Sequence, residues 1–552
     1  MHRIKQLIYC PMTRHRSIHT VCHAHLDPVW LWTWQEGLIE AISTFRVAVD
    51  FCKKYPSFKF CQGDALLYQW VESNDPTLFT EIKKLVKTGR WHIMSGSYLQ
   101  PDLNLPSGES HIRQFLYAIT YFVRNFGVRP ETAWNIDSFG QAEGLPQILS
   151  GCGIKYYIFS RPRPASWKPP EGVFRWRDRS GNEVLALRYR GSYNTRKDVR
   201  RQLESLIADS DKNTDLIFLW GLGDHGGGPS HEQFRVLESL RRRFPALKYS
   251  TPSAFFRPFS QHKDILPIVT GEFQNASPGC YTSMARIKSA HRKAENLITA
   301  VERLASFAWW LKQYEYPKKD LDWAWRQILF TEFHDVITGT CIQPAENDTL
   351  NMLFACHDLL KRLQTKLLLK FARHVSSEDK YTCPIFVFNP HSFNTDIDLE
   401  FSFNHSVTPD PPNTIHFAVY MNGKRIPSQR ERGPLNVEHD WNLYGCCHVK
   451  LPPLSLVKLD VKWKRLSSPP RIQTRHITTS KLRLRSKYLK IVINPRTGLL
   501  DWAGTATSGS SYLKASALQP VVFRDISHSW WCGTPSFSAG ASGKPVSEWG
   551  KP

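Results

Sequence analysis

The sequence predicts a multidomain protein in which an α/β domain is followed by an all-α and then an all-β domain. At 552 residues the chain is too long for a single hydrophobic core. Short apolar strands alternate with amphipathic helices over roughly the first 260 residues, before a helical and then a β-type pattern begins. We therefore expect an α/β domain at 1–265, a helical bundle at 266–378 and a β-sandwich at 379–552.

Seven short apolar runs are the strand candidates of the first domain. Helical stretches lie between them, and this alternation favours a seven-stranded (β/α) barrel-like domain with helices outside. One helix is expected at 109–126, where apolar residues recur at spacings of four and three and should face the core. Those residues are Ile112, Leu116, Ile119, Val123 and Phe126. The strand candidates are 18–22, 58–61, 91–94, 132–136, 155–160, 184–189 and 215–220.

The second and third domains differ in their periodicity. Within 346–374, a helical stripe is formed by Cys356, Leu360, Leu363, Leu367 and Phe371, which is typical of a helix in a bundle. After residue 379 the chain alternates apolar and polar residues, as in "IFVFNPHSFNTDIDLEFSF", which predicts β-strands. Small polar residues dominate from Ala503 onward, so we expect the β-sandwich to be incomplete at residue 552.

The composition is that of a folded soluble protein. Apolar residues make up 41% of the chain, and no apolar run approaches the length that spans a bilayer. The basic N-terminus lacks the apolar stretch and cleavage site of a secretory signal. Twelve scattered cysteines, with no C-x-x-C pair, suit a reducing compartment. We therefore expect a cytoplasmic protein without a membrane partner.

The net charge of +23 raises the question of a nucleic-acid partner. The excess is spread over the chain in short clusters, such as 241–244 and 481–490, and no RNA- or DNA-binding signature is present. We interpret the charge as a solvated surface compatible with anionic substrates, and we expect no nucleic-acid partner. The sequence does not determine the oligomeric state, and a homo-oligomer is compatible with it.

Polar clusters follow four of the expected strands. "HAHLD" follows 18–22, "NIDSFG" follows 132–136, Arg161 follows "KYYIFS", and "GLGDHGGG" follows "DLIFLW". In a parallel sheet, all four clusters open on the same face. A fifth cluster, "FHDVITGT", lies in the helical region. This convergence indicates a functional site more strongly than any one cluster does.

The first of these clusters has the donor types of a zinc site. His25 and Asp27, two residues apart on an extended chain, point to the same side and can reach one ion. Asp137 and His334 are the natural residues to complete a four-ligand shell. An isolated H-x-D pattern is more often an ordinary strand end, so both interpretations remain open at this point.

Two aspartates are candidates for acid–base chemistry. Asp137 follows a strand and precedes a tight turn, and its simpler interpretation is a helix cap. Asp224 lies among five glycines, which allow close backbone approach to a ligand. The glycine loop lacks the lysine of a nucleotide P-loop. Two carboxylates at strand ends are the minimal apparatus of glycoside hydrolysis, although spacing in sequence does not establish their proximity.

Four of the motifs together resemble glycoside hydrolase family 38, the α-mannosidases. They are "HAHLDPVW", "WNIDSFG", "GLGDHGGGP" and "EFHDVITGT", in this order, and the resemblance covers about residues 20–500. "GDHGGGP" and "SGCGIKYYIFSRP" are most similar to the bacterial and cytosolic branch. The resemblance implies a zinc-dependent, retaining enzyme that removes non-reducing terminal α-mannosyl residues from glycans or oligosaccharides.

The resemblance also implies a role for each motif residue. One Zn²⁺ would be held by His25, Asp27, Asp137 and His334, with His23 outside the shell, and another divalent metal would suit the same ligands. Asp137 would also be the nucleophile, and Asp224 the general acid/base. The ion would hold the mannose hydroxyls on carbons 2 and 3 rather than activate water. The implied substrate-binding residues are Trp30, Phe139, Arg161 and Asp335, with Arg161 keeping the nucleophile ionised.

Two features of the chain depart from the family pattern. Gln141 stands where relatives often carry histidine. Family members also usually continue well beyond residue 552, through β-domains that lend residues to the sugar pocket. Two alternatives therefore stand beside the α-mannosidase. One is a hydrolase of mannosylglycerate or its 6-phospho form, and the other is a truncated, catalytically inactive carbohydrate-binding relative.

Overall fold

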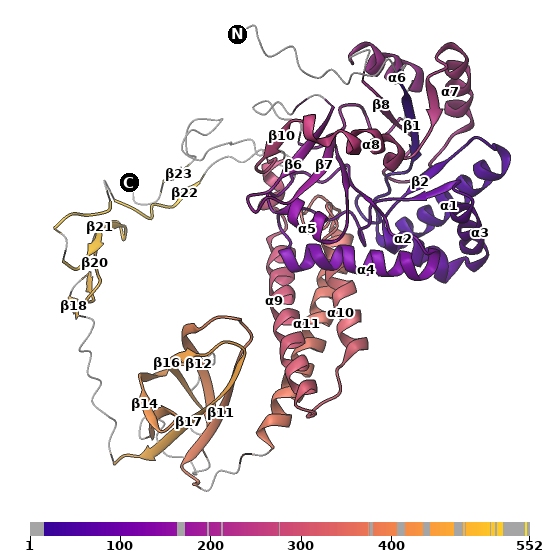
Figure 1. Ribbon diagram of the computed structural model, residues 1–552. Helices are drawn as coiled ribbons and strands as arrows, with labels where there is room; N and C mark the ends of the chain where they lie inside the picture. The colour runs from indigo at the N-terminus through magenta and orange to yellow at the C-terminus, as the bar shows by residue number, and fades with distance from the viewer. Residues whose placement is uncertain are drawn as a thin grey trace. The chain divides into compact units, whose positions relative to one another are not determined.

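The computed structural model divides into two compact units, which are described separately (Figure 1). The first contains the residues up to Ile298 together with Lys318–Lys361, and the second contains chiefly Thr299–Pro317 and Arg362–Ser527. The structure describes residues 16–522 and 547–548, except for 163–169, 171, 196–197, 211–213, 275–276, 374, 376–378, 406–414, 434–441, 468–477, 481, 508 and 514–515.

The first sheet is built around β1 (Ile18–His23), whose six residues are all buried. One edge of β1 pairs in parallel with β8 (Leu216–Trp220). The other edge is divided, because β9 (Leu247–Tyr249) pairs with Ile18–Thr20 and β2 (Phe60–Gln62) pairs with Cys22 and His23. Beyond β2 lies β3 (Trp91–Ile93), also parallel. The carboxyl ends of β1 and β8 therefore lie side by side.

The second sheet has the order β10-β6-β7-β5-β4. β4 (Thr132–Asn135), β5 (Tyr156–Phe159) and β7 (Glu183–Arg188) are parallel, whereas β6 (Val173–Arg177) forms an antiparallel hairpin with β7 and carries β10 (Ile268–Thr270) on its far edge. Val21 of the first sheet and Trp134 of the second share one buried core, so the two sheets pack together.

The seven predicted strands all form, but the predicted barrel is not confirmed. Among the described strands, no pairing joins the two sheets into a closed ring. The apolar pattern of the sequence did not predict β6, β9 and β10. The β6–β7 hairpin explains why the second sheet stays open at one edge. β6 runs antiparallel to β7, and its other side pairs with β10, which is the edge strand. The domain is a mixed α/β structure with two sheets.

Helices surround the two sheets (Figure 1). They are α1 (Trp34–Lys54), α2 (Ala65–Asn74), α3 (Pro76–Lys87), α4 (Gly108–Phe126), α5 (Leu145–Gly151), α6 (Val199–Ala208), α7 (His231–Arg243) and α8 (Pro252–Gln261), with the short 3-10 turns η1 (Lys263–Ile265) and η2 (Pro278–Tyr281). Local sequence sets the ends of α4. The Ser107 hydroxyl caps its first turn, and Gly127 ends it in the left-handed conformation that glycine favours.

The predicted buried stripe of α4 is largely wrong. Ile112, Leu116 and Val123 are exposed by 41%, 49% and 46%. The buried face includes Gln114, which hydrogen-bonds to the Glu332 carboxylate. Apolar periodicity alone missed this face because part of it is polar and is satisfied by partners distant in sequence.

Three long helices follow the α/β region, and Figure 1 shows them side by side. They are α9 (Ala285–Trp310), α10 (Lys318–Thr331) and α11 (Gln343–Ala372), and the division between the two units falls within α9 and α11. Four residues of the predicted α11 stripe, Cys356, Leu360, Leu363 and Leu367, are buried as expected. The stretch predicted to be helical is therefore helical.

The second unit contains a two-sheet β-structure. One sheet has the order β11-β17-β13-β14 and the other β12-β16-β15, and both contribute to one buried core that includes Phe403, Val419 and Val461. The strands are β11 (Thr382–Asn389), β12 (Thr395–Asn404), β13 (Ile415–Met421), β14 (Lys424–Ile426), β15 (Ser428–Glu431), β16 (Asn442–Leu451) and β17 (Ser455–Arg465). These two facing sheets agree with the expected β-sandwich.

Further strands form two small sheets. They are β18 (Thr478–Ser480), β19 (Arg483–Arg485), β20 (Leu489–Ile493) and β21 (Leu500–Thr505), and the pair β22 (Val521–Val522) and β23 (Ser547–Glu548). Most of the segment from Ala503 onward, where small polar residues dominate, lies outside the described residues.

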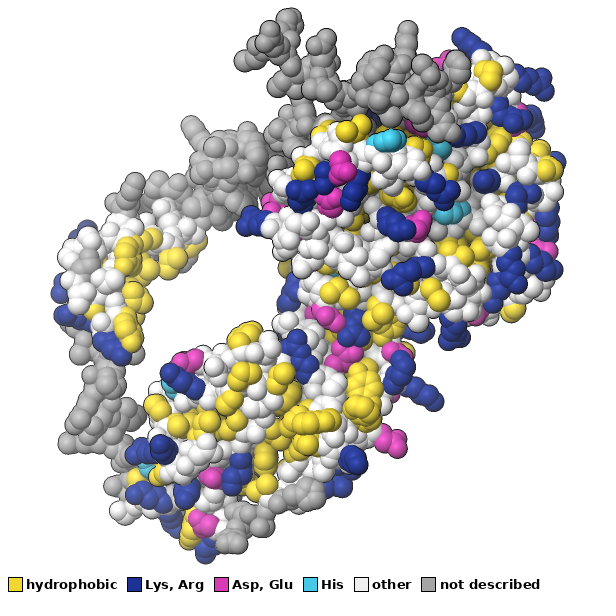
Figure 2. All heavy atoms as spheres, in the orientation of Figure 1, with side chains coloured by type: hydrophobic (Ala, Val, Ile, Leu, Met, Phe, Trp, Pro, Cys, Tyr) yellow, Lys and Arg dark blue, Asp and Glu magenta, His cyan; other side chains and the backbone are white. Residues whose placement is uncertain are grey.

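The surface agrees with the interpretation of the net charge. On the face shown in Figure 2, Lys and Arg side chains are scattered rather than gathered in one patch. No helix in the described part of the chain is long and apolar enough to cross a membrane.

Candidate functional site

The loop after β1 carries His25 and Asp27 beside the loop after β8. Leu26 and Asp224 form a parallel bridge, in which Asp27 N donates to Asp224 O at 2.9 Å and Asp224 N donates to His25 O at 2.6 Å. The parallel pairing of β1 with β8 brings these two strand ends together, as expected for neighbouring parallel strands.

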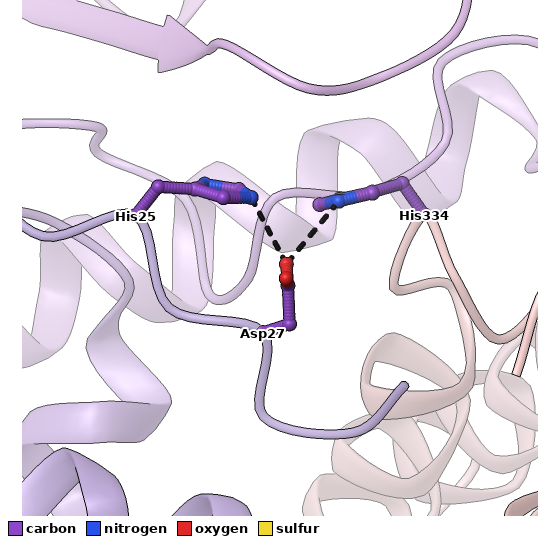
Figure 3. A group of neighbouring side chains, drawn as sticks. All are labelled: His25, Asp27 and His334. Atoms are coloured by element: carbon purple, nitrogen blue, oxygen red, sulfur yellow. Dashed lines mark ion pairs between the residues drawn. The ribbon is translucent and has the colours of Figure 1, made fainter. Parts of the chain in front are cut away.

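Three side chains from distant parts of the chain converge on one point, as Figure 3 shows. His25 Nε2 lies 2.9 Å from Asp27 Oδ1, and His334 Nε2 lies 3.5 Å from the same oxygen. Asp137 approaches the group with Oδ2, which is 4.0 Å from His25 Nε2 and 3.6 Å from His334 Nε2. The structure thus brings together the four side chains of the predicted ligand set.

Three polar atoms of this group are buried without a hydrogen-bond partner. His25 Nε2, Asp27 Oδ1 and His334 Nε2 have no hydrogen-bond partner, although an unpartnered buried polar atom costs about 1–3 kcal/mol. Imidazole nitrogens and carboxylate oxygens are the donors that bind Zn²⁺. A cation at their centre would satisfy all of them at once, so the residues fit a metal ion.

The tautomer of His334 suits metal binding. Its Nδ1 lies 2.9 Å from the Gln100 carbonyl oxygen, which can only accept a hydrogen bond. Nδ1 therefore carries the hydrogen, and in the neutral ring the lone pair of Nε2 faces Asp27 and Asp137. His23, in contrast, packs against Trp134, and burial lowers its pKa to about 3. His25, not His23, belongs to the group.

Asp137 divides its two oxygens between two sets of neighbours. Oδ1 accepts a hydrogen bond from the Tyr193 hydroxyl at 2.6 Å and pairs with Arg161 Nε at 2.5 Å, whereas Oδ2 faces the histidines. Burial alone would favour the neutral acid, but His334 and Arg161 outweigh it and hold the pKa of Asp137 well below its usual range. Asp137 is therefore an oriented carboxylate at neutral pH.

Asp224 lies at the edge of the group and is half-buried. Its Oδ2 accepts a hydrogen bond from Asn194 Nδ2 at 3.0 Å. Because Tyr193 contacts Asp137 and Asn194 contacts Asp224, two adjacent residues after β7 link the two carboxylates. The sequence analysis did not predict Tyr193 and Asn194 as site residues, although "YRGSYNT" is another polar cluster that follows a strand.

The glycine-rich loop around Asp224 is packed against the β1 loop rather than opened for a ligand. A Cβ on Gly223 would lie 2.7 Å from His25 O, and one on Gly221 would lie 2.0 Å from His23 O. The close backbone approach predicted from the glycines is therefore an approach to the protein's own backbone, and it sets the position of Asp224.

The remaining predicted site residues lie in or near the same region. Asp335 Oδ2 is 3.8 Å from His334 Nε2, and burial raises the pKa of Asp335 to about 7. Phe139 is 1% exposed, with its ring between His334 and Arg161. Trp30 stacks edge-on against Trp32, and its carbonyl accepts from Ile342 N. Trp30 thus lies in the loop between β1 and α1.

Gln141, which departs from the family pattern, supports the arginine. Its Nε2 donates to the Arg161 carbonyl at 3.0 Å, its Oε1 accepts from the Tyr157 hydroxyl, and its backbone pairs with Phe273. The departure therefore leaves the neighbourhood of Asp137 ordered.

A second cluster of similar composition differs in one respect. His291, Glu295 and Glu332 are buried close together, but Ser110 and Arg292 bind Glu295, while Gln114 binds Glu332. None of the polar atoms of these three residues is without a hydrogen-bond partner in the described structure. This cluster is a satisfied polar network, whereas the His25 group is not.

Comparisons with known proteins identify the domains of this chain. Residues 15–274 match the family model of the glycosyl hydrolases family 38 N-terminal domain, and residues 278–371 match that of the alpha mannosidase middle domain. The chain is 32% identical over 352 residues to human alpha-mannosidase 2C1, and 33% identical over 346 residues to alpha-mannosidase G of Dictyostelium discoideum. These alignments cover 62% and 61% of this chain, and 33% and 31% of those relatives.

A solved structure shares the fold of this chain. The crystal structure of an alpha-mannosidase from Enterococcus faecalis V583 aligns with a TM-score of 0.75 at 16% identity, and the alignment covers 95% of this chain and 64% of that one. At that identity the likeness supports the fold alone. The two matched domains, in their order and beside the relatives that share them, show that the chain belongs to glycoside hydrolase family 38.

Proposed function

We propose that this chain is a zinc-dependent α-mannosidase that removes non-reducing terminal mannose from glycans or oligosaccharides with retention of configuration. The observation that carries the proposal is the group of three buried metal-donor atoms that have no hydrogen-bond partner and face an ionised Asp137. The chain spans about a third of the length of the curated relatives it matches, so its activity is proposed for the sequence as given.

Asp137 is proposed as the nucleophile. One of its carboxylate oxygens forms a bond to the anomeric carbon while the bond from that carbon to the glycosidic oxygen breaks, and Asp224 gives its proton to the departing oxygen. The contacts of Asp137 with Arg161 and Tyr193 hold the carboxylate ionised and fix its orientation before the reaction.

Asp224 then acts as the general base. Water adds to the anomeric carbon and gives a proton to the Asp224 carboxylate, while the bond to Asp137 breaks. Two inversions at one carbon give overall retention. The Asn194 hydrogen bond and the backbone bridge to His25 and Asp27 support this assignment, since they hold Asp224 beside the candidate ligands.

His25, Asp27, Asp137 and His334 would hold the zinc ion. When bound, the ion would hold mannose hydroxyl groups and orient the ring at Asp137. Asp335 would accept hydrogen bonds from sugar hydroxyls, while Trp30 and Phe139 would face the sugar ring. A cytoplasmic location stays a prediction of the sequence.

Hydrolysis of p-nitrophenyl α-mannoside tests the proposal. We expect turnover that stops after removal of metal with a chelator, returns with zinc, and falls at least about a thousandfold in Asp137→Asn. The matched control is Asp178→Asn, which alters a buried aspartate that caps the β6–β7 turn through Ser180 and Asn182.

The product and substrate range complete the test. NMR of the first-formed sugar should show the α-anomer. Turnover that is indifferent to chelation would contradict the zinc assignment, and mannoside binding without turnover would support an inactive carbohydrate-binding relative. Preference for mannosylglycerate, or for its 6-phospho form, over oligosaccharides would assign the other hydrolase activity.

A further inference from the structure

Gln100 occupies a central place among the segments that carry the candidate ligands. It follows β3 in a loop and is only 3% exposed. Its segment runs antiparallel to the one that carries His334, with a bridge between Pro101 and Phe333. In this bridge, Gln100 O accepts from His334 N at 3.3 Å, and Glu332 O accepts from Asp102 N at 2.9 Å.

The Gln100 carbonyl oxygen accepts a second hydrogen bond. The same oxygen accepts the hydrogen of His334 Nδ1 at 2.9 Å, so it fixes both the backbone and the ring of that histidine. The ring cannot rotate without breaking this bond, and its Nε2 stays directed at Asp27 and Asp137.

The Gln100 side chain reaches the other ligand segments. Oε1 accepts from Ile136 N, the amide next to Asp137, at 3.2 Å. Nε2 donates to Asp64 Oδ2 at 3.0 Å and lies 3.4 Å from His25 Nδ1. Asp64 is itself held by the Ser95 hydroxyl and has a φ of 63°, a conformation unusual for a residue other than glycine.

We propose that Gln100 is the positioning residue of the cation site, which links the segments bearing Asp137 and His334. It contacts both segments from outside the group, so it acts on a bound ion only through these ligands. This inference rests on the proposed function, because it requires that the four side chains bind a divalent cation. Loss of such outer contacts typically weakens metal binding about 10–100-fold.

The test compares Gln100→Met with Gln114→Met in the full 552-residue chain. Methionine keeps the volume of glutamine but cannot hold Ile136 N or Asp64. Gln114 is a suitable control because it is equally buried, accepts from Leu99 N, and donates to Leu329 O and Glu332, none of which is a candidate ligand. Zinc dissociation constants are measured by competition with a chelating dye, and thermal unfolding is recorded for each metal-free protein.

We expect Gln100→Met to bind zinc about 10–100-fold more weakly than the wild type, while Gln114→Met binds it like the wild type even if it unfolds earlier. The activity of Gln100→Met should return as zinc is raised at a temperature below the unfolding transition of the metal-free variant, where loss of folding does not contribute. If Gln100→Met fails to fold, Gln100→Glu replaces it, since glutamate keeps an oxygen for Ile136 N and loses the donor to Asp64.

The experiment distinguishes a failure of the positioning role from a failure of the proposed metal site. Equal zinc affinity in the wild type and the Gln100 variant would overturn the positioning role alone. A wild-type chain that binds no zinc would overturn the proposed metal site and this inference together. An equal loss of affinity in Gln114→Met would show a general effect of buried amides and would also refute the role of Gln100.

Discussion

Gly223→Ala should damage catalysis through the backbone, although it changes no functional side chain. The new Cβ would lie 2.7 Å from His25 O and 3.1 Å from His25 N, whereas ordinary contacts begin at 3.4 Å. The obstacle is backbone, so no side-chain rotation relieves it. The Asp224 loop and the His25 loop must separate by about 0.7 Å along the line to the His25 oxygen.

The expected losses of activity and stability follow from that separation. The hydrogen bond from Asp224 N to His25 O is now 2.6 Å and would lengthen, so Asp224 moves relative to the His25 group. A misplacement of about 1 Å can cost on the order of a hundredfold in rate, so we expect kcat/KM to fall about 10–100-fold. The strain should lower the free energy of unfolding by about 1–3 kcal/mol.

The assay is kcat/KM for p-nitrophenyl α-mannoside at saturating zinc, together with thermal unfolding. Gly108→Ala is the matched control, because a Cβ there meets nothing within 4 Å and alanine favours the first turn of α4. The reasoning is refuted if Gly223→Ala retains the activity and stability of Gly108→Ala.

Two further predictions concern stability. Because only the folded chain assembles the His25 group, zinc at a hundred times its dissociation constant should stabilise the wild type by about 2.7 kcal/mol in a melting experiment, and Asp27→Asn should lose most of this gain. Burial and Lys248 outweigh Asp215 at His19 and lower its pKa from 6.5 to about 4. The unfolded state therefore binds the proton more readily, and this group destabilises the fold progressively as pH falls from 6.5 to 4, by about 3 kcal/mol at most. Denaturant titrations at these two pH values should show a smaller acid loss in His19→Gln than in the wild type; an equal loss would contradict the assignment.

The sequence predicted what local pattern and strand order determine. The apolar run before His25 and the one before Asp224 are recognisable strands, and parallel strands bring such ends to one side of a sheet. The closure of the sheet was not predictable in the same way, because β6 folds back on β7 and periodicity does not distinguish a hairpin from a crossover. The prediction of the buried face of α4 was wrong because Gln114 is buried with a hydrogen-bond partner more than two hundred residues away.

The candidate site was likewise predictable from the sequence only in part. His25, Asp27, Asp137 and His334 are residue types with an obvious chemistry, so a search for donors finds them. Tyr193 and Gln100 act through hydrogen bonds whose partners are fixed only by the tertiary structure. Such residues have no signature in the sequence of one chain.

The bridge between Pro101 and Phe333 also determines how this protein can be divided and recombined. Three of the four candidate ligands lie in the segment matched by the N-terminal family model, and the fourth, His334, lies in the segment matched by the middle one. Neither segment is a transferable module for this chemistry. A gene fusion or an expression boundary placed between residues 274 and 278 would separate His334 from the other candidate ligands, so protein engineering must keep the two segments together.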